Sequence, residues 1–571
     1  MSFLDQPAFA RLKNRRVLEI ATAIALCVVL LMAIHLRFFK MPRTPITDRD
    51  TWGYFHPALA VFFKGYFDQS ERQFLYPGFT LLVMRAKQNV DFLAAVQSVI
   101  GLIGGVFLWL AWMKLRRFFA PERFAIFGVA FAHALLGILM IAVYLLSLRR
   151  VVLEHTIRPE AIFPSVSAFL LWLSLVFLDE AFLKKKRTAL LWLQGTLILF
   201  ASSVLYLLKP QWGVSLIFAA LPLVVVFFAG SYRVKFAMIA AAIAGIALSY
   251  FALFLPEEKL NEKFNARTMP FLPTLMFCIH SNIIYPELLR DIESPSPPYD
   301  RAFLQAVADD VKYALTNPPG VGVYPSLGFD PDYIIYRSKA MRLMESHFDG
   351  DPKGYGKFCE HYYFMAVRHQ PLAMAKKVLG ELRLFYRLRG NVTDCLKNFV
   401  YTVRYSYSLN LLDNSTTISP DVQKWDVLKR YRDEVAALAD SEERVHEHKL
   451  VTMLQKFLDV TYLLVLFAFV VIGLIFRKMR TVSPTLFSLP PLFVGLWLFS
   501  FNFGLTLTTA LTHSMKVSRY TDVQFAFTVF SYFAAALWIV VFVLEFLRAR
   551  KIEAEPARER QVEKNESREL M

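Results

Sequence analysis

Two carboxylates stand at a position in the chain where they could do chemistry. Asp48 and Asp50 directly follow the first long apolar stretch, and an aromatic, amphipathic stretch from Trp52 to Phe67 comes next. A segment of that kind can lie flat in the membrane interface, which would put both carboxylates at the depth of the lipid headgroups. There a carboxylate could take a proton from a hydroxyl group, and the pair could bind a divalent cation through its oxygens. The alternative is that Asp48 only caps a helix that begins near Thr51.

An arginine beside a proline marks a second candidate position. In Arg158-Pro159-Glu160, the proline is expected to open an apolar helix, which places Arg158 at the helix N-terminus, where anions are favoured. Arginine can hold a phosphate through two parallel hydrogen bonds. Glu160 could orient this arginine or meet a second substrate, and a plain ion pair between the two side chains is the alternative.

Three further polar residues are expected near the same membrane surface. Lys209 lies in a turn between two apolar stretches, while Arg519 and Tyr520 precede the last one. Lys209 is a candidate phosphate ligand, and Arg519 with Tyr520 would suit a phosphate approached from the side opposite Arg158. The alternatives are headgroup contacts of long side chains and, for Lys209, an interfacial anchor beside Trp212.

The elements that must position these side chains are membrane helices. Of the 571 residues 56% are hydrophobic, 53 are Phe and only 19% are charged, which is too apolar for a water-soluble enzyme of this length. The apolar residues gather in stretches of about 20, the length that crosses a hydrocarbon core of about 30 Å. We predict an all-α polytopic membrane protein with about ten transmembrane helices. The predicted spans are 17 to 39, 92 to 113, 122 to 147, 160 to 179, 188 to 208, 211 to 229, 233 to 255, 456 to 476, 485 to 508 and 522 to 547.

The basic residues predict the orientation. With ten spans, the clusters of Lys and Arg in the short loops all fall on one side, which the positive-inside rule makes the cytoplasm. Both termini are then cytoplasmic. The net charge of +17 is explained by this topology and requires no nucleic acid partner.

The spans divide the chain into four parts. Residues 1 to 255 form an N-terminal transmembrane module with its first outer loop at 40 to 91, and residues 256 to 455 are expected to form a mainly helical outer domain in the periplasm. Residues 456 to 550 hold the C-terminal transmembrane helices, and the charged stretch 551 to 571 is expected to be a disordered cytoplasmic tail. Three of the four cysteines lie in the outer domain, which allows one disulfide.

The first outer loop resembles that of the GT-C glycosyltransferase superfamily, which includes protein O-mannosyltransferases and the lipid A aminoarabinose transferase. A first span is followed by an acidic D-x-D-like pair, two interfacial helices and an Arg-Tyr-Pro-type segment. The matching residues are Asp48, Asp50, Tyr54, Arg72, Tyr76 and Pro77. The resemblance covers the first seven spans by layout and the first loop by motif.

This resemblance implies a function and a location. The enzyme would transfer a sugar from a polyprenyl-phosphate donor to a glycan, lipid or protein acceptor on the outer face of a bacterial inner membrane. Asp48 and Asp50 would be catalytic, with Asp48 as the general base, and Tyr54, Arg72 and Tyr76 would contact substrate. No cofactor is implied beyond a divalent cation that the two carboxylates could bind.

Three other functions remain open. An O-antigen ligase or polymerase would carry its key arginines in the late outer loop and no acidic pair after the first span. A transporter or flippase for lipid-linked sugars would show charges deep within its spans and two matching halves, whereas these spans are almost free of charge. A structural assembly protein would leave the outer aspartates and arginines unexplained.

Overall fold

The computed structural model describes thirteen parts of the chain. They are residues 15–48, 50–65, 72–118, 127–184, 188–263, 271–317, 324, 326–386, 396–415, 418–458, 489–514, 522–544 and 546–547.

Long apolar helices dominate the described residues. Nine of them are long and apolar enough to cross a membrane, since about 20 residues at 1.5 Å each span about 30 Å. They are α2 (Arg15–His35), α5 (Val90–Leu115), α6 (Phe127–Leu146), α8 (Phe163–Leu178), α9 (Thr188–Leu208), α10 (Gly213–Ala229), α11 (Tyr232–Ser249), α26 (Leu489–Thr512) and the span Phe525–Leu544. The prediction of an all-α, multi-pass membrane protein is confirmed. The predicted span 456 to 476 lies outside the described residues from 459 onward.

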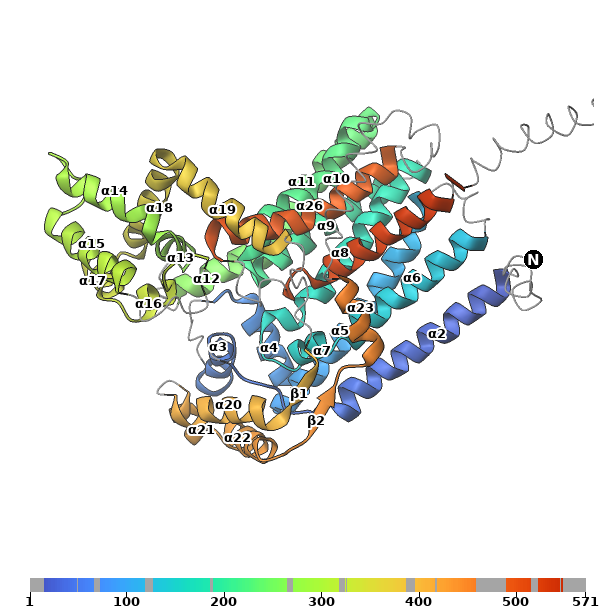
Figure 1. Cartoon of the computed structure of the whole chain (residues 1–571), viewed down its shortest axis with the longest axis horizontal. Coiled ribbons are helices and arrows are strands. Elements are labelled where there is room, and N and C mark those ends of the chain that lie inside the picture. The colour runs from blue at the N-terminus through green and yellow to red at the C-terminus, as the bar shows by residue number, and fades with distance from the viewer. Residues whose placement is uncertain are drawn as a thin grey trace, which may run out of the picture.

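The long helices lie side by side in one bundle (Figure 1). Within it α5 packs on α8, α9 on α11, α10 on α26 and α2 on α6. The outward face of α2 is apolar, with Ile20, Ile24 and Leu31 each more than half exposed. Exposed apolar side chains in such number mark a surface that faces lipid.

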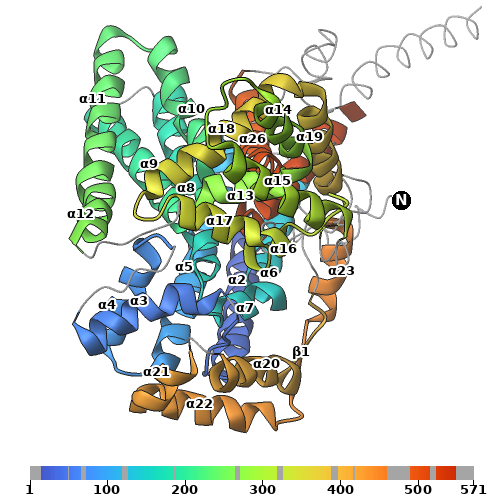
Figure 2. The same cartoon turned by 90° about the vertical axis from the view of Figure 1, so that its left-hand side faces the viewer.

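Shorter helices gather at the end of the bundle opposite the start of α2, and we call this the capped end (Figures 1 and 2). The other end is the open end. The last described span ends there as well, because Leu544 packs near Gly128 at the start of α6, while Phe525 stacks on Tyr144 near the end of α6. Both ends of the described chain therefore lie at the open end.

The loops between the first spans supply the inner part of the cap. The first loop forms η2 (Leu36–Lys40), α3 (Thr51–Lys64) and α4 (Leu75–Ala86), and the second loop forms α7 (Leu148–Glu154) and η5 (Pro159–Ala161). Both predicted interfacial helices are present in the first loop. Neither exceeds 14 residues, which is too short to span the hydrocarbon core.

The segment after α11 contributes α12 (Leu255–Lys263) and then a first lobe with its own hydrophobic core. Its helix α15 buries Leu304, Val307, Ala308 and Val311, a spacing that places one apolar stripe against the neighbouring helices. The lobe contains α13 (Phe271–Ile279), α14 (Ser281–Glu293), α15 (Arg301–Thr316), α16 (Pro331–Tyr336), α17 (Lys339–His347), α18 (Pro352–His369) and α19 (Pro371–Tyr386).

The cysteines of the first lobe are free thiols. Cys278 and Cys359 are both buried in its core. They do not form the disulfide that the sequence allowed, and Cys395 lies outside the described residues.

A second lobe completes the cap. It consists of β1 (Asn398–Val400), α20 (Tyr401–Asn414), α21 (Ser419–Lys424), α22 (Asp426–Ala439), β2 (Arg444–His446) and α23 (Lys449–Leu458). The two strands pair antiparallel, with Phe399 opposite Val445. Unlike the first lobe, these residues share one hydrophobic core with the bundle and the first loop. The region expected as a single outer domain thus contains two parts. The second shares its core with the membrane helices, whereas the first has a separate core and contacts α26 through α13 and α19.

Candidate active site

The turn before α3 fixes the orientation of Asp48. Its Oδ1 accepts hydrogen bonds from the backbone N–H groups of Asp50 and Thr51, each at 3.0 Å. This is the geometry of a helix cap, so the capping alternative is correct for one carboxylate oxygen. The other oxygen, Oδ2, points to Arg158. The cap therefore holds the carboxylate in place through Oδ1, and Oδ2 is paired with Arg158.

Arg158 joins the two aspartates. Its Nη1 lies 2.7 Å from Asp48 Oδ2, and its Nη2 lies 2.8 Å from Asp50 Oδ2. The planar guanidinium fork suits two oxygens side by side. Pro159 opens the short turn η5 and not the apolar helix, which begins at Phe163. The prediction that Arg158 stands at the N-terminus of that helix is therefore wrong, and the arginine lies one turn ahead of α8.

Glu160 forms ion pairs with both Arg158 and Lys209 and so holds Arg158 in position. The Glu160 carboxylate is fully buried, with Oε1 at 2.8 Å from Lys209 Nζ and Oε2 at 3.7 Å from Arg158 Nε. Burial raises the pKa of Glu160, but the charges of Lys209 and Arg158 outweigh it and lower this pKa to about 2. Glu160 is thus a permanent anion that positions two cations. Lys209 is no simple interfacial anchor, and Trp212 beside it is buried in the protein with its Nε1–H donating to Ser202 Oγ.

Arg72 and two tyrosines form the other wall. Arg72 Nη2 donates to Asp50 Oδ1 at 3.1 Å, and its guanidinium lies 5.0 Å above the Tyr54 ring, a cation–π contact. Tyr54 and Tyr76 meet edge to face. The Tyr76 hydroxyl donates to Gln97 Oε1, and burial together with the charge of Glu160 raises the pKa of Tyr76. Tyr76 therefore remains a neutral donor.

The structure brings eight of the ten predicted site residues together at the capped end. We call these eight the charged cluster. They are Asp48, Asp50, Tyr54, Arg72, Tyr76, Arg158, Glu160 and Lys209. The other two, Arg519 and Tyr520, lie outside the described residues.

The cluster is electrically balanced and partly exposed. Its three carboxylates face three cationic side chains. Asp48 and Asp50 are each about a quarter exposed, whereas Glu160 is inaccessible. An arriving anion must therefore take cations away from the aspartates, and an arriving hydroxyl group can reach the aspartates but not Glu160.

The same residues are poorly suited to binding a metal ion. In the described parts of the chain, no three or more His, Cys, Asp or Glu side chains come together to hold one. The space between the nearest oxygens of Asp48 and Asp50 is bridged by the Arg158 guanidinium. A divalent cation would need oxygen ligands from elsewhere, because Mg²⁺ and Ca²⁺ take six or more.

Several residues that position the cluster were not predicted from the sequence. Three buried tyrosine hydroxyls of the second lobe donate to backbone carbonyls of the segment that leads to Asp48. Tyr401 donates to Lys40 (2.7 Å), Tyr405 to Thr44 (2.6 Å) and Tyr431 to Pro45 (2.7 Å). Together with Ser408, which bonds to both the N–H and the carbonyl of Thr47, they form what we call the hydroxyl clamp.

A signal for the clamp exists in the sequence. Tyr401, Tyr405 and Ser408 recur at spacings of four and three, which places their hydroxyl groups on one face of a helix. The spacing alone gives no hint of what that face binds.

A buried ion cluster joins η2 of the first loop to α7 of the second loop. Arg37 in η2 binds Glu154 through both ends of its fork, at 2.6 and 3.0 Å, and Arg150 Nε lies 3.2 Å from the same carboxylate. A Cβ at Gly101 would lie only 2.1 Å from Glu154 Oε1, so the glycine makes room for the carboxylate. Arg150 also donates to the backbone carbonyl of Glu160 at 3.1 Å, which ties this ion cluster to the charged cluster.

Comparison with known proteins identifies no protein that this chain is similar to. The chain matches no protein-family model, no curated protein and no solved structure. The resemblance carried by Asp48, Asp50, Tyr54, Arg72 and Tyr76 therefore remains a prediction, and the geometry of the charged cluster is the basis for a function.

Proposed function

We propose that the chain is a GT-C-type membrane glycosyltransferase that moves a sugar from a polyprenyl-phosphate donor to a glycan, lipid or protein acceptor of the cell envelope. The observation that carries this proposal is the bridge from Arg158 to both Asp48 and Asp50 at the capped end of a membrane bundle. This bridge places an arginine that can bind a phosphate beside carboxylates that can accept a proton, at one membrane surface. The capped end then faces the periplasm, and both termini lie in the cytoplasm.

The first step is capture of the donor phosphate. Arg158 offers two parallel N–H donors, and Lys209 and Arg72 offer further positive charge on either side. A phosphate bound to Arg158 replaces the aspartate oxygens as its partner. Glu160 stays behind as the buried anion that keeps Arg158 and Lys209 in position.

The second step is sugar transfer. The acceptor hydroxyl oxygen attacks the anomeric carbon, the bond from this carbon to the phosphate oxygen breaks, and the carrier leaves as polyprenyl phosphate. The hydroxyl proton passes to Asp48 Oδ2, which donor binding has released from Arg158. Negative charge grows on the phosphate as the bond breaks, and Arg158 with Lys209 stabilises it.

A binding assay tests the first step. The purified protein in detergent is titrated with polyprenyl phosphate, alongside Arg158→Ala and Asp48→Asn. We expect Arg158→Ala to weaken binding at least about tenfold, since a charge-assisted bidentate contact is lost. Asp48→Asn should bind as well as wild type or better, because a competitor for Arg158 is gone. Equal binding by wild type and Arg158→Ala would overturn the proposal.

One observation favours a second function. Arg37, which lies in the first candidate span, pairs with Glu154 deep in the protein. Buried charges in membrane segments are typical of transporters, so a flippase for lipid-linked sugars is the second candidate. In sealed vesicles, movement of a labelled lipid-linked sugar across the bilayer without any transfer product would favour it over the transferase.

A further inference from the structure

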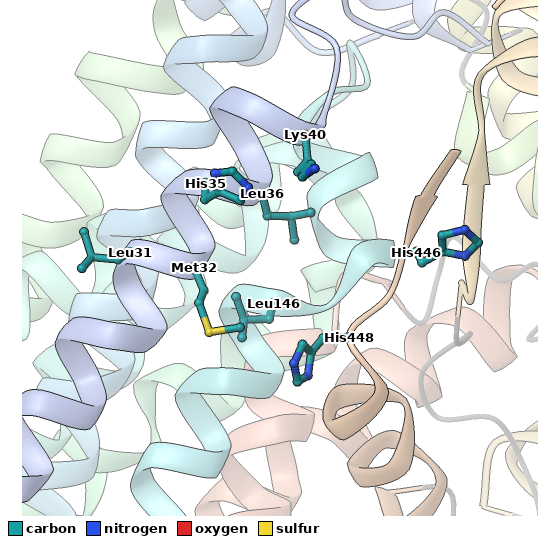
Figure 3. Close-up of a pocket in the computed structure, with 8 residues that line it drawn as sticks. All are labelled: Leu31, Met32, His35, Leu36, Lys40, Leu146, His446 and His448. Atoms are coloured by element: carbon teal, nitrogen blue, oxygen red, sulfur yellow. The ribbon is translucent and has the colours of Figure 1, made fainter. Parts of the chain in front are cut away.

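A pocket of about 500 Å³ lies beside α2 and η2, and none of the residues that line it belongs to the charged cluster (Figure 3). It lies between α2, the end of α6 and the chain that runs from β2 into α23. Leu31, Met32 and Leu146 line its apolar part, and His35, Lys40 and His448 line its polar part. We propose that this pocket binds an anionic diacyl phospholipid from the leaflet at the capped end.

Along α2 and η2, the residues that line the pocket change from apolar to polar, as the parts of an amphiphilic molecule do. Leu31 and Met32 lie within the apolar span, His35 follows one turn later, and Lys40 ends η2. At 1.5 Å per residue, Leu31 and Lys40 are separated by about 13 Å along the axis. Apolar side chains thus lie at the depth of acyl chains, and polar ones lie where a phosphate headgroup begins.

The pocket is open to lipid. Leu31 is 65% exposed and Met32 37% exposed, although both belong to a membrane span. Leu146, in contrast, is buried at the bottom. An occupant therefore enters sideways from the bilayer, which favours a lipid over a solute from water.

The polar part suits a single negative charge. Among the described residues, no carboxylate lies within ion-pair distance of the Lys40 ammonium, which leaves it to a ligand. His448 Nδ1 accepts the Leu450 N–H at 3.3 Å, so its hydrogen is on Nε2, which can donate. A phosphodiester with one charge fits one ammonium beside the imidazole N–H of His448.

The pocket is distinct from the charged cluster. Arg37, on the same helix, turns inward to Glu154 and is 1% exposed, while His35 and Leu31 face outward. None of the pocket residues belongs to the charged cluster, so the proposal does not depend on sugar transfer. A link exists through the backbone, because the Lys40 carbonyl accepts the Tyr401 hydroxyl at the start of the hydroxyl clamp.

Native mass spectrometry of the full-length protein tests the site. The protein is released from micelles that contain phosphatidylglycerol or phosphatidylcholine, and retained lipid is counted. Two variants are compared with wild type. One is the double variant Lys40→Gln and His448→Gln, and the other is Met32→Trp, whose larger side chain fills the apolar part of the pocket. Lys87→Gln is the matched control, because it removes one lysine charge at the capped end outside the pocket, where Lys87 lies over Phe92.

We expect wild type and Lys87→Gln to retain phosphatidylglycerol in preference to phosphatidylcholine. The double variant should bind it roughly five- to tenfold more weakly, as one lysine near a surface contributes a factor of about five. Met32→Trp should lose both lipids. Thermal unfolding in lipid-free micelles verifies that each variant is folded, and Lys40→Gln alone replaces any variant that is not.

Three outcomes would overturn the proposal. Equal retention of phosphatidylglycerol by wild type and the folded variant would remove the lipid from this pocket. Equal retention of the two lipids would remove the headgroup contact. Displacement of phosphatidylglycerol by inorganic phosphate, or by polyprenyl phosphate at far lower concentration, would assign the pocket to a free anion or to the donor.

Discussion

Ile46 and Thr156 form a parallel β-bridge, and this pairing sets Asp48 beside Arg158. The Ile46 N–H donates to His155 O at 2.7 Å, and the Ile157 N–H donates to Ile46 O. Side chains in extended chains alternate with a period of two, so the residues two positions further along both segments emerge on the same side. The first and second loops are thereby joined where the charged cluster forms.

Asp48→Asn is expected to slow transfer strongly without loss of donor binding. The amide keeps an oxygen for the cap at Asp50 and Thr51 but accepts no proton, so turnover should fall roughly a hundredfold. Transfer of a radiolabelled sugar, measured with saturating donor, gives the effect. Asp413→Asn is the control, because it breaks an exposed ion pair with Arg432 that includes no residue of the charged cluster. If Asp48→Asn is normal and Asp50→Asn is inactive, the two aspartates exchange roles.

Arg158→Lys is expected to bind donor more weakly than wild type while keeping the positive charge. An ammonium lacks the planar fork of a guanidinium, so the two parallel hydrogen bonds to the donor phosphate are lost. The dissociation constant for polyprenyl phosphate should rise by about tenfold, equal to about 1.4 kcal/mol. Unchanged affinity in Arg158→Lys would show that charge alone matters at this position.

Removal of Lys209 is expected to cost stability that removal of Glu160 restores. Lys209→Met leaves the Glu160 carboxylate buried with one cation fewer, which should destabilise the fold by about 3 kcal/mol. Glu160→Gln in the same chain removes the stranded charge. Denaturant unfolding of both single variants and the double variant measures the coupling, and additive losses would argue against a direct interaction.

The stability of the protein should fall in acid. The pKa of Glu160 is about 2 in the folded protein against an ordinary value of 4.5, so the unfolded chain binds the proton more tightly. Ionised Glu160 therefore contributes up to about 3 kcal/mol to the free energy of unfolding. This contribution is complete above about pH 4.5 and is lost as the pH falls toward 2. Glu160→Gln should remove this part of the pH dependence. An identical acid profile in the variant would contradict the assignment.

Tyr405→Phe is expected to loosen the segment that carries Asp48. The lost hydroxyl leaves the buried Thr44 carbonyl without this donor, at about 1 kcal/mol. Transfer should slow while polyprenyl phosphate binding is retained, because Arg158 is untouched. Tyr407→Phe is the control, since Tyr407 lies on the same helix but is largely exposed. Equal activity of the two variants would limit the clamp to a structural role.

Much of the fold could be predicted from the sequence. Hydropathy is a local property, since a stretch of about 20 apolar residues prefers lipid whatever its neighbours are. The nine candidate spans in the described residues therefore correspond to nine of the predicted spans. The charged residues near span ends could be selected in the same way, because a charge at a membrane surface needs a partner, and this drew attention to Asp48, Arg158 and Lys209.

Only the tertiary structure decided which partners meet. Asp48 and Arg158 lie 110 positions apart, and they come together through the Ile46–Thr156 bridge, which no local pattern predicts. The hydroxyl clamp comes from residues about 360 positions beyond the segment it binds. Arg37 turns inward to Glu154, because the space beside Gly101 receives that carboxylate. Such pairings depend on how helices pack, and packing depends on shape and on all neighbours together, whereas span formation depends on one segment at a time.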